Sequence, residues 1–335
     1  MKILLTQLRR IGDVITTTPA VRAVRHAWPE AQIDYMTESP SDEIFRHSPY
    51  VDNLIVLKRR QSVVEFIKTV RKLRAAKYHA MVDFFGNPTS AYLTALSGAR
   101  YKIGFDIRFR RHFYTHTVNT AAFPGSLYAG LHKLALVALI GAGSMGSRPE
   151  FFIGSDEELE ADTLLKSLGV KPNERYVTLG IATRHAFRQW PMENFARLAD
   201  ELISRFKVKI LPIYGPGEEQ YPKKLRELMK HELLCDYPAS GIGRMRALFE
   251  RAALHIGCDN GPANIAKASD IPNIILYSNT HASSWTPPDS PVCVALEHDL
   301  VCKARCLHER CSHSNCIRLI TVDEVLKEAE KFLKN

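Results

Sequence analysis

The chain has 335 residues, 45% of them hydrophobic and 24% charged, which is the composition of a globular protein long enough for two domains. Lys and Arg outnumber Asp and Glu by 45 to 36, so the net charge of +9 favours a nucleic acid, an anionic lipid surface or a phosphorylated substrate as partner. Met1–Leu5 is followed by Arg9 and Arg10 without a signal-peptide core, and the longest apolar run, 134–140, is too short to cross a bilayer. These features predict a cytoplasmic protein that can still touch a membrane surface.

Strands and helices alternate along the first half of the chain. Hydrophobic periodicity predicts strands at 2–6, 32–36, 54–57 and 80–84, and helices at 13–28, 63–76, 89–96 and 126–140. Gly141–Gly146 satisfies the G-x-G-x-x-G pattern of dinucleotide-binding folds, but it follows a helix and precedes Ser-Arg-Pro-Glu. Because that motif needs a strand before it and a helix after it, we interpret the segment as a helix end and an interdomain linker.

The second half repeats the alternation. It predicts strands at 176–181, 208–213, 254–257 and 273–277, and helices at 191–206, 218–230, 244–251, 262–269 and 321–333. Two such series predict an α/β fold with two doubly wound parallel sheets and a site where the strand ends face each other. The expected domains are 1–150 and 151–320, followed by a C-terminal helix, 321–335, that can pack back on the first domain.

The stretch 254–273 carries the strongest local signal for a ligand. An apolar strand breaks at Cys258–Gly261 and the chain resumes as a helix, with Pro262 in its first turn. A tight turn from a strand into a helix leaves backbone N–H groups and the positive end of a helix dipole available for a phosphate. Taken alone, the pattern is equally that of an ordinary βα turn.

Four separated motifs resemble glycosyltransferase family 9, the lipopolysaccharide heptosyltransferases. They are Gly12-Asp13 after the first strand, Arg188-Gln-Trp-Pro191, Tyr214–Glu218 and Asp259–Asn264. The resemblance covers nearly the whole chain and implies the GT-B arrangement of two facing Rossmann-like domains, with the acceptor in the first and the nucleotide sugar in the second. It implies an inverting transfer of heptose from ADP-L-glycero-D-manno-heptose to the inner core of lipopolysaccharide, an acceptor of the lipid A–Kdo type, at the inner face of the inner membrane. No cofactor is expected for catalysis, and no nucleic acid is expected as a partner.

Sugar transfer needs a group that takes the proton of the acceptor hydroxyl and groups that stabilise the leaving diphosphate. Asp13 matches the Gly-Asp pair of the family and is the predicted general base, with helix N-capping as its structural alternative. Arg188 is the predicted positive charge at the diphosphate, with a solvated surface charge as the alternative. If Asp13 is only a cap, Asp83 is the next candidate for the base.

The predicted donor site draws mainly on loops of the second half. Asp259 would hold hydroxyl groups of the donor sugar, or else only cap a helix. Asn260 and Asn264 stand where the family has Ser or Thr and His, and an Asn side chain can still bond to a hydroxyl or a phosphate. The complete predicted set is Gly12, Thr183, Arg184, Glu218, Met245, Asp259, Asn260, Gly261, Pro262 and Asn264.

Basic residues of the first half are predicted to meet the anionic acceptor. They occur in two clusters, one before the helix at 63–76 and one after residue 107, and an asparagine follows the strand at 80–84. A solvated surface is the alternative explanation for such clusters. The predicted acceptor set is Arg59, Arg60, Asn87, Arg108, Arg110 and Arg111.

Cysteines gather near the C-terminus. Clustered thiols in a cytoplasmic protein favour a metal over disulfides, so a structural Zn or Fe is predicted, with unliganded thiols as the alternative. The related autotransporter heptosyltransferases have a cysteine-bound iron in a comparable region. The predicted ligands are Cys302, Cys306, Cys311 and Cys316, four of the seven cysteines in the chain.

Two other functions stay open at this point. One is the same architecture acting on another nucleotide sugar or on a protein, as in an epimerase or an autotransporter heptosyltransferase. The other is a non-catalytic basic binding protein, which would need aromatic residues among its basic clusters as stacking platforms. The 108–111 cluster contains only Phe109, so the sequence favours the enzyme.

Overall fold

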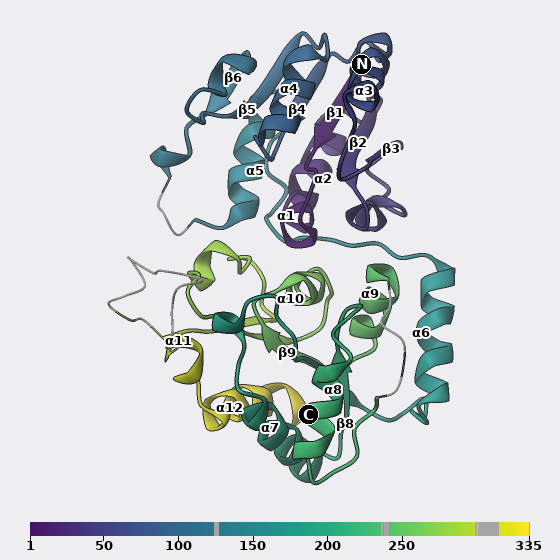
Figure 1. Cartoon of the computed structure of the whole chain (residues 1–335), viewed down its shortest axis with the longest axis vertical. Helices are drawn as coiled ribbons and strands as arrows, with labels where there is room; N and C mark the ends of the chain where they lie inside the picture. The colour runs from purple at the N-terminus through teal and green to yellow at the C-terminus, as the bar shows by residue number, and fades with distance from the viewer. Residues whose placement is uncertain (124–126, 236, 238–240, 299, 301–314, 335) are drawn as a thin grey trace. The chain divides into compact units, whose positions relative to one another are not determined.

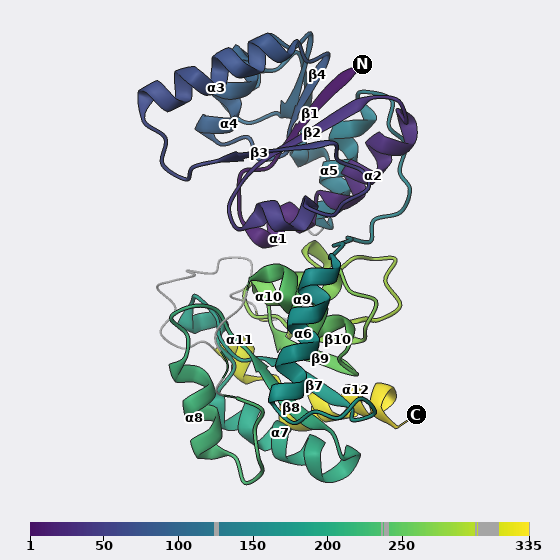
Figure 2. The same ribbon diagram turned by 90° about the vertical axis from the view of Figure 1, so that its right-hand side faces the viewer.

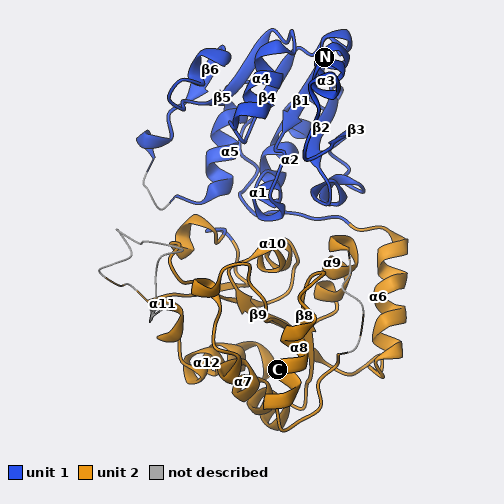
Figure 3. Cartoon of the chain, viewed as in Figure 1, with its two compact units in different colours: residues 1–152, 287–289 blue, residues 153–286, 290–335 orange. Residues whose placement is uncertain are grey.

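The computed structural model describes residues 1–335 except 124–126, 236, 238–240, 299, 301–314 and 335. The chain forms two compact units, shown in Figures 1 and 3. The first contains Met1–Phe152 and Pro287–Asp289, and the second contains Ile153–Thr286 and Ser290–Asn335. Each unit has one parallel sheet with helices packed on it, which confirms the predicted fold class.

The first unit is built on a six-stranded sheet in the order β3-β2-β1-β4-β5-β6, the classical Rossmann order. In Figure 2, α3 and α4 lie on one side of this sheet and α2 and α5 on the other. The strands are β1 (Lys2–Thr6), β2 (Gln32–Glu38), β3 (Asn53–Leu57), β4 (Ala80–Asp83), β5 (Tyr101–Phe105) and β6 (His116–Val118). The helices are α1 (Ile11–Ile15), α2 (Thr18–Ala27), α3 (Val63–Ala76), α4 (Pro88–Leu96) and α5 (Ala129–Ala138).

The second unit is built on a five-stranded parallel sheet in the order β11-β10-β9-β7-β8. Its strands are β7 (Tyr176–Gly180), β8 (Lys209–Ile213), β9 (Leu254–Cys258), β10 (Asn273–Leu276) and β11 (Cys293–Leu296). Its helices are α6 (Ser155–Ser167), α7 (Met192–Phe206), α8 (Gln220–Leu228), α9 (Ile242–Glu250), α10 (Gly261–Lys267), α11 (Asn315–Arg318) and α12 (Val322–Leu333).

The apolar runs that predicted the central strands are the buried ones. Ile3, Leu4 and Leu5 of β1 and the whole of β9 are buried, as expected for strands covered on both faces. α3 begins with a capping box in which Ser62 and Glu65 each bond to the other's backbone N–H, and it follows the predicted bounds.

The helix predicted at 13–28 is two helices, α1 and α2. The hydroxyls of Thr16, Thr17 and Thr18 each donate to the carbonyl oxygen three residues earlier, which competes with continuation of the helix. Pro19 has no N–H to donate to the preceding turn. The break leaves Asp13 on a short helix of its own.

The C-terminal helix packs in the second unit, and its packing back on the first domain stays a prediction. α12 contacts α7 and the strands β9 and β10. Its apolar residues Val322, Val325, Leu326, Ala329 and Leu333 join the core around Trp190 and Phe195. Its periodic apolar face is covered by these neighbours within the second unit.

Several elements were missed because their sequence signal is weak. β5 contains Gly104, β6 has three residues, and β11 is only partly buried. α6 is strongly acidic in its first turn and buries only Ala161, Leu164 and Leu165. These segments depend on tertiary packing more than on local propensity.

Candidate active site

Each sheet has one point at which the chain reverses its direction of winding, and parallel sheets bind ligands at the carboxyl ends of the strands there. In the first sheet that point lies between β1 and β4, and in the second between β7 and β9. Asp13 and Asn87 lie in the segments that follow β1 and β4, and Arg188 and Asp259 in those that follow β7 and β9. The predicted catalytic residues therefore follow strands at the two switch points.

An ion pair occupies the switch point of the second sheet. Asp259, directly after β9, is 5% exposed and its Oδ2 lies 3.3 Å from Arg188 Nη1. The same oxygen accepts a hydrogen bond from the Thr280 hydroxyl at 3.0 Å. Arg188 is partly exposed, and its Nε has no hydrogen-bond partner among the described residues. Asp259 therefore orients the guanidinium and leaves some of its donors available for a ligand.

The turn into α10 provides fewer backbone donors than predicted. Asn260 is the N-cap, and its Oδ1 accepts from the N–H of Ala263 at 2.9 Å. The N–H of Asn264 is bonded to the carbonyl oxygen of Asn260, and Pro262 has no N–H. α10 is also only seven residues long. A diphosphate bound here would therefore depend mainly on side-chain cations for positive charge.

Lys267 is a buried cation beneath this turn that the sequence did not single out. Its Nζ donates to Asn264 Oδ1 at 3.2 Å, to Tyr277 Oη at 3.0 Å and to the carbonyl oxygen of Trp285 at 3.0 Å. Burial lowers its pKa, but the Tyr277 and Asp259 oxygens outweigh burial and leave the pKa raised. Lys267 therefore stays charged and fixes the Asn264 amide, whose Nδ2 donates to Asn260.

The other predicted donor residues lie in the same unit with different surroundings. Thr183 is buried, and its hydroxyl donates to the carbonyl oxygen of His185, whereas Arg184 is exposed. Glu218 closes its own loop by accepting from the N–H of Gly215 at 2.7 Å. Met245 is buried on α9. Their contact with a donor stays a prediction.

In the first unit, Asp13 is not the N-cap of its helix. Arg10 is the N-cap, and Asp13 is the third helical residue, whose Oδ2 accepts from the N–H of Arg10 at 3.3 Å. The Asp13 side chain is partly exposed and Gly12 beside it is buried. Its second carboxylate oxygen is therefore free of this capping bond and can accept a proton.

Asp83, the alternative base, is enclosed by the fold. It is fully buried, its Oδ1 accepts from the N–H groups of Phe85 and Gly86 at 2.9 Å, and its Oδ2 accepts from Tyr114 Oη at 2.7 Å. Burial raises the pKa of Asp83, although these hydrogen bonds lower it. Its oxygens shape the loop after β4, so the geometry favours Asp13 as the base.

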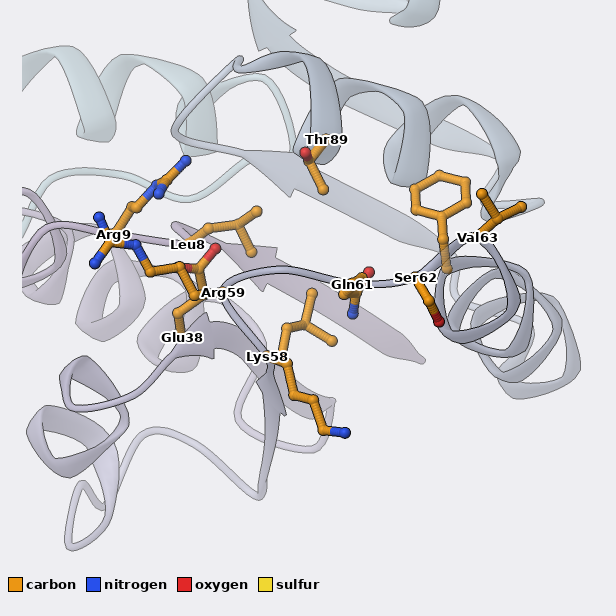
Figure 4. Close-up of a pocket in the computed structure, with 11 residues that line it drawn as sticks. Leu8, Arg9, Glu38, Lys58, Arg59, Gln61, Ser62, Val63 and Thr89 are labelled. Carbon is orange, nitrogen blue, oxygen red and sulfur yellow. The ribbon is translucent and has the colours of Figure 1, made fainter.

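A basic pocket lies beside the carboxyl ends of β1, β2 and β3 (Figure 4). Its volume is about 280 Å³, and its charged lining residues are Arg9, Glu38, Lys58 and Arg59. Burial raises the pKa of Glu38, and the cations Arg9 and Arg59 oppose that shift. The sequence singled out Arg59 for this site but not Arg9 or Glu38, which are brought near each other by the parallel alignment of β1 and β2.

The remaining predicted acceptor residues follow other strands of the same sheet. Arg60 is exposed next to the pocket, and Asn87 caps α4 by accepting from the N–H of Ser90 at 2.8 Å. Arg108 and Arg111 are exposed after β5, and the Nε of Arg110 is buried without a partner among the described residues. Because β3 and β5 are four strand positions apart, about 19 Å separates the two basic clusters, with β1 and its loop between them.

The predicted metal ligands Cys302, Cys306 and Cys311 lie outside the described residues, and Cys316 lies on α11. Across the part of the chain that the structure describes, no group of three or more His, Cys, Asp or Glu side chains is arranged to hold a metal ion. The prediction of a cysteine-bound metal stays a prediction.

Comparison with known proteins places the chain in a family. Residues 66–317, more than half of the chain, match glycosyltransferase family 9 (heptosyltransferase). The chain is 28% identical to lipopolysaccharide heptosyltransferase 1 of Escherichia coli K12 over 297 residues, 84% of this chain and 88% of that protein. Its fold is similar to a glycosyltransferase family 9 structure from Veillonella parvula (TM-score 0.90, 21% identity, 99% of this chain and 97% of that one). It is also similar to E. coli heptosyltransferase WaaC with ADP-2-deoxy-2-fluoro heptose (TM-score 0.72, 21% identity, 99% of each chain).

The two parallel-sheet units are those of a GT-B glycosyltransferase. The chain belongs to glycosyltransferase family 9, the heptosyltransferases. It is therefore an enzyme that transfers glycosyl groups, and the family predicted from the four motifs is confirmed. Among the described residues, no helix is both long and apolar enough to cross a bilayer.

Proposed function

We propose that this enzyme transfers heptose from ADP-L-glycero-D-manno-heptose to the inner core of lipopolysaccharide with inversion at the anomeric carbon. The observation that carries the donor assignment is the Arg188–Asp259 pair at the switch point of the second sheet. Its buried carboxylate and partly exposed guanidinium suit a ligand that combines sugar hydroxyls with a diphosphate. The similar structure of E. coli WaaC with ADP-2-deoxy-2-fluoro heptose supports ADP as the nucleotide of the donor.

The second unit would bind the donor and stabilise its leaving group. Arg188 would donate to the diphosphate as its charge grows, and an arginine is well suited because its planar fork bonds two phosphate oxygens at once. Asp259 would accept from sugar hydroxyls while it holds Arg188 in place. Lys267 adds a fixed positive charge beneath the same turn.

The first unit would supply the base. In an inverting transfer, the acceptor oxygen attacks the anomeric carbon as the bond to the diphosphate breaks, and Asp13 takes the hydroxyl proton. A carboxylate is a weak base for an alcohol, so the proton moves late, once bond formation has made the hydroxyl acidic. The products are the extended acceptor, ADP and the protonated carboxyl group of Asp13, which then releases its proton to water.

The basic pocket of Figure 4 would hold an anionic sugar of the acceptor. Arg9 and Arg59 can neutralise one carboxylate or phosphate, while Glu38 can accept hydrogen bonds from hydroxyl groups and repel a second anionic group. A Kdo residue, which combines a single carboxylate with several hydroxyls, has this chemistry.

α3 would face the membrane surface in which a lipid-linked acceptor is embedded. Val63, Val64 and Ile67 are exposed on its first two turns, and Lys68 and Arg71 follow on the same side. Apolar side chains beside cations are typical of helices that lie on anionic bilayers. Val64→Asp should weaken binding to phosphatidylglycerol vesicles several-fold, whereas Leu159→Asp, at an exposed leucine on α6, should not; equal effects would contradict this surface.

The donor assignment is tested by thermal unfolding of the intact enzyme. ADP at 100 times its dissociation constant should stabilise the protein by about 2.7 kcal/mol, whereas adenosine at the same concentration should stabilise it far less because it lacks the diphosphate. Release of ADP from ADP-heptose with heptose-deficient lipopolysaccharide as acceptor tests the reaction. Equal stabilisation by adenosine, or ADP release that is the same without acceptor, would contradict the proposal.

The cysteine cluster is proposed as a structural metal site on its sequence pattern. Elemental analysis of protein purified without chelator should give about one Zn or Fe per chain, and Cys306→Ser should lose it. Freely titrating thiols in a metal-free preparation would contradict the site.

A further inference from the structure

A buried lysine lies at the carboxyl edge of the first sheet, outside the predicted site. Lys133 on α5 is 9% exposed, and its Nζ donates to Gln7 Oε1 at 3.2 Å and to the carbonyl oxygen of Phe84. Its ammonium lies 5.2 Å from the centroid of the Phe105 ring. Gln7 follows β1, Phe84 follows β4 and Phe105 ends β5, so the ammonium is held beside the switch point of this sheet.

Gln7 connects this ammonium to the loop that precedes Asp13. Its Nε2 donates to the carbonyl oxygen of Arg9 at 2.6 Å, and the N–H of Arg10 donates to Asp13 Oδ2 at 3.3 Å. The carbonyl of Arg9 and the N–H of Arg10 belong to one peptide group. A series of hydrogen bonds therefore runs from Lys133 through Gln7 and this peptide to the carboxylate of Asp13.

The chemistry of the partners fixes the orientation of the Gln7 amide. An ammonium can only donate and a carbonyl oxygen can only accept, so Gln7 must turn its oxygen toward Lys133 and its nitrogen toward Arg9. Gln7 is itself 1% exposed, so bulk water does not compete for either bond. A glutamate at position 7 would keep the bond to Lys133 but would repel the carbonyl oxygen of Arg9.

Stability does not account for a charge at this position. Burial lowers the pKa of Lys133 to about 8, although the carboxylates of Asp13 and Asp83 oppose the shift. A lysine whose pKa falls on folding destabilises the folded state while it is charged. At neutral pH, Lys133 therefore costs stability, and a role in placing other groups explains its presence better than a role in holding the fold.

We propose that Lys133 and Gln7 are positioning residues that hold the Arg9–Arg10 peptide and, through it, the carboxylate of Asp13. The inference rests on the function proposed above, in which Asp13 takes the acceptor proton. Gln7 sets the direction of the peptide, and Lys133 fixes Gln7 and places a positive charge on the inner side of the carboxylate. Neither residue touches the substrate.

A double-mutant cycle on turnover separates this role from general support of the fold. Lys133→Met keeps the length of the side chain and should lower kcat about tenfold or more when Asp13 is present, because a displaced base reacts poorly. In the Asp13→Asn background the same change should alter kcat less than about twofold, since the group it positions no longer acts. Donor KM should stay unchanged in both backgrounds, and Lys102→Met on β5 serves as the control for loss of a cation.

Hydrogen exchange tests the positioning without any assay of activity. The amide of Arg10 should exchange about tenfold faster in Lys133→Met and in Gln7→Met than in the wild type, and no faster in Lys102→Met. If ADP-heptose is not turned over at all, the proposed function fails, but this measurement still decides whether Lys133 and Gln7 hold the loop. Unchanged exchange of Arg10 would overturn the proposal.

Gln7→Glu provides a second variant in case Lys133→Met does not fold. It retains a partner for the Lys133 ammonium, so the buried charge stays satisfied, but it loses the donor to Arg9. We expect kcat to fall as much as in Gln7→Met and the amide of Arg10 to exchange faster. Wild-type turnover in Gln7→Glu, or an equal loss from Lys133→Met with and without Asp13, would overturn the proposal.

Discussion

The two units each bury a lysine, and the pKa values of the two lysines shift in opposite directions. Each places an aspartate and a buried lysine near the switch point of its sheet: Asp13 and Lys133 in the first, Asp259 and Lys267 in the second. The pKa of Lys133 is lowered to about 8, whereas that of Lys267 is raised. Both lysines are almost fully buried, so burial alone does not determine the charge of either.

The difference lies in the partners of each ammonium. Lys267 donates to three oxygens, including that of Tyr277, and has the buried carboxylate of Asp259 near it. Lys133 has two neutral oxygen partners and a ring face, and the carboxylates of Asp13 and Asp83 do not offset its burial. A buried charge is stable when enough hydrogen bonds and an opposite charge replace its water. The second unit therefore holds a permanent charge, and the first unit holds one with a pKa of about 8.

The largest expected effect is the loss of turnover when Asp13 of the first unit is replaced. Asp13→Asn keeps the size of the side chain and can still accept from the N–H of Arg10, but it loses the basic oxygen. Turnover should fall by about 10²-fold or more. The free energy of unfolding should change by less than about 1 kcal/mol, because a negative charge in the first turn of a helix contributes about 0.3–1 kcal/mol. Steady-state kinetics and thermal unfolding check both parts. Near-normal turnover would mean that Asp13 only completes the capping box of α1.

The Arg188–Asp259 ion pair of the second unit can be broken separately. Arg188→Met should weaken ADP binding by about tenfold or more, because a charge-assisted hydrogen bond contributes about 1.5–3 kcal/mol, and should leave adenosine binding unchanged. Calorimetric titration of both ligands measures the difference. Arg197→Met, an exposed arginine of α7, is the matched control. An equal loss for ADP and adenosine would contradict a diphosphate at Arg188.

How far the sequence predicts these features depends on how local their causes are. The bounds of α3 were predicted because a capping box begins the helix and its periodicity continues to the end. The turn at Asn260–Pro262 was also recognised, since its capping chemistry lies within a few residues. In contrast, Lys133 meets Gln7 across 126 positions of sequence, and no local pattern could connect them. Lys267 was missed because a lysine on a short helix is normally exposed.

Replacing each lysine by methionine should change the free energy of unfolding of the protein differently. Lys267→Met leaves the oxygens of Asn264, Tyr277 and Trp285 without this donor. It also removes one of the two cations near Asp259, which keeps Arg188. We expect it to lower the free energy of unfolding by about 2 kcal/mol, the usual cost of buried polar groups that lose a partner. Denaturant unfolding at pH 7 measures this. If Lys267→Met were as stable as the wild type, the charge of Lys267 would not contribute to the stability of the second unit.

The smallest expected effect is a difference in pH dependence, and it tests the comparison most directly. The pKa of Lys133 is about 8 in the folded enzyme and about 10.4 in an unfolded chain, so above pH 8 the folded state loses this proton first. The unfolded state then binds more protons, and the contribution of Lys133 to stability must rise with pH over that window. The free energy of unfolding of the wild type minus that of Lys133→Met should therefore rise by about 1 kcal/mol between pH 7 and pH 9. The corresponding difference for Lys267→Met should stay flat, because a raised pKa keeps Lys267 charged in both states over this range. Parallel curves for the two variants would show that the lysines do not differ in charge as described.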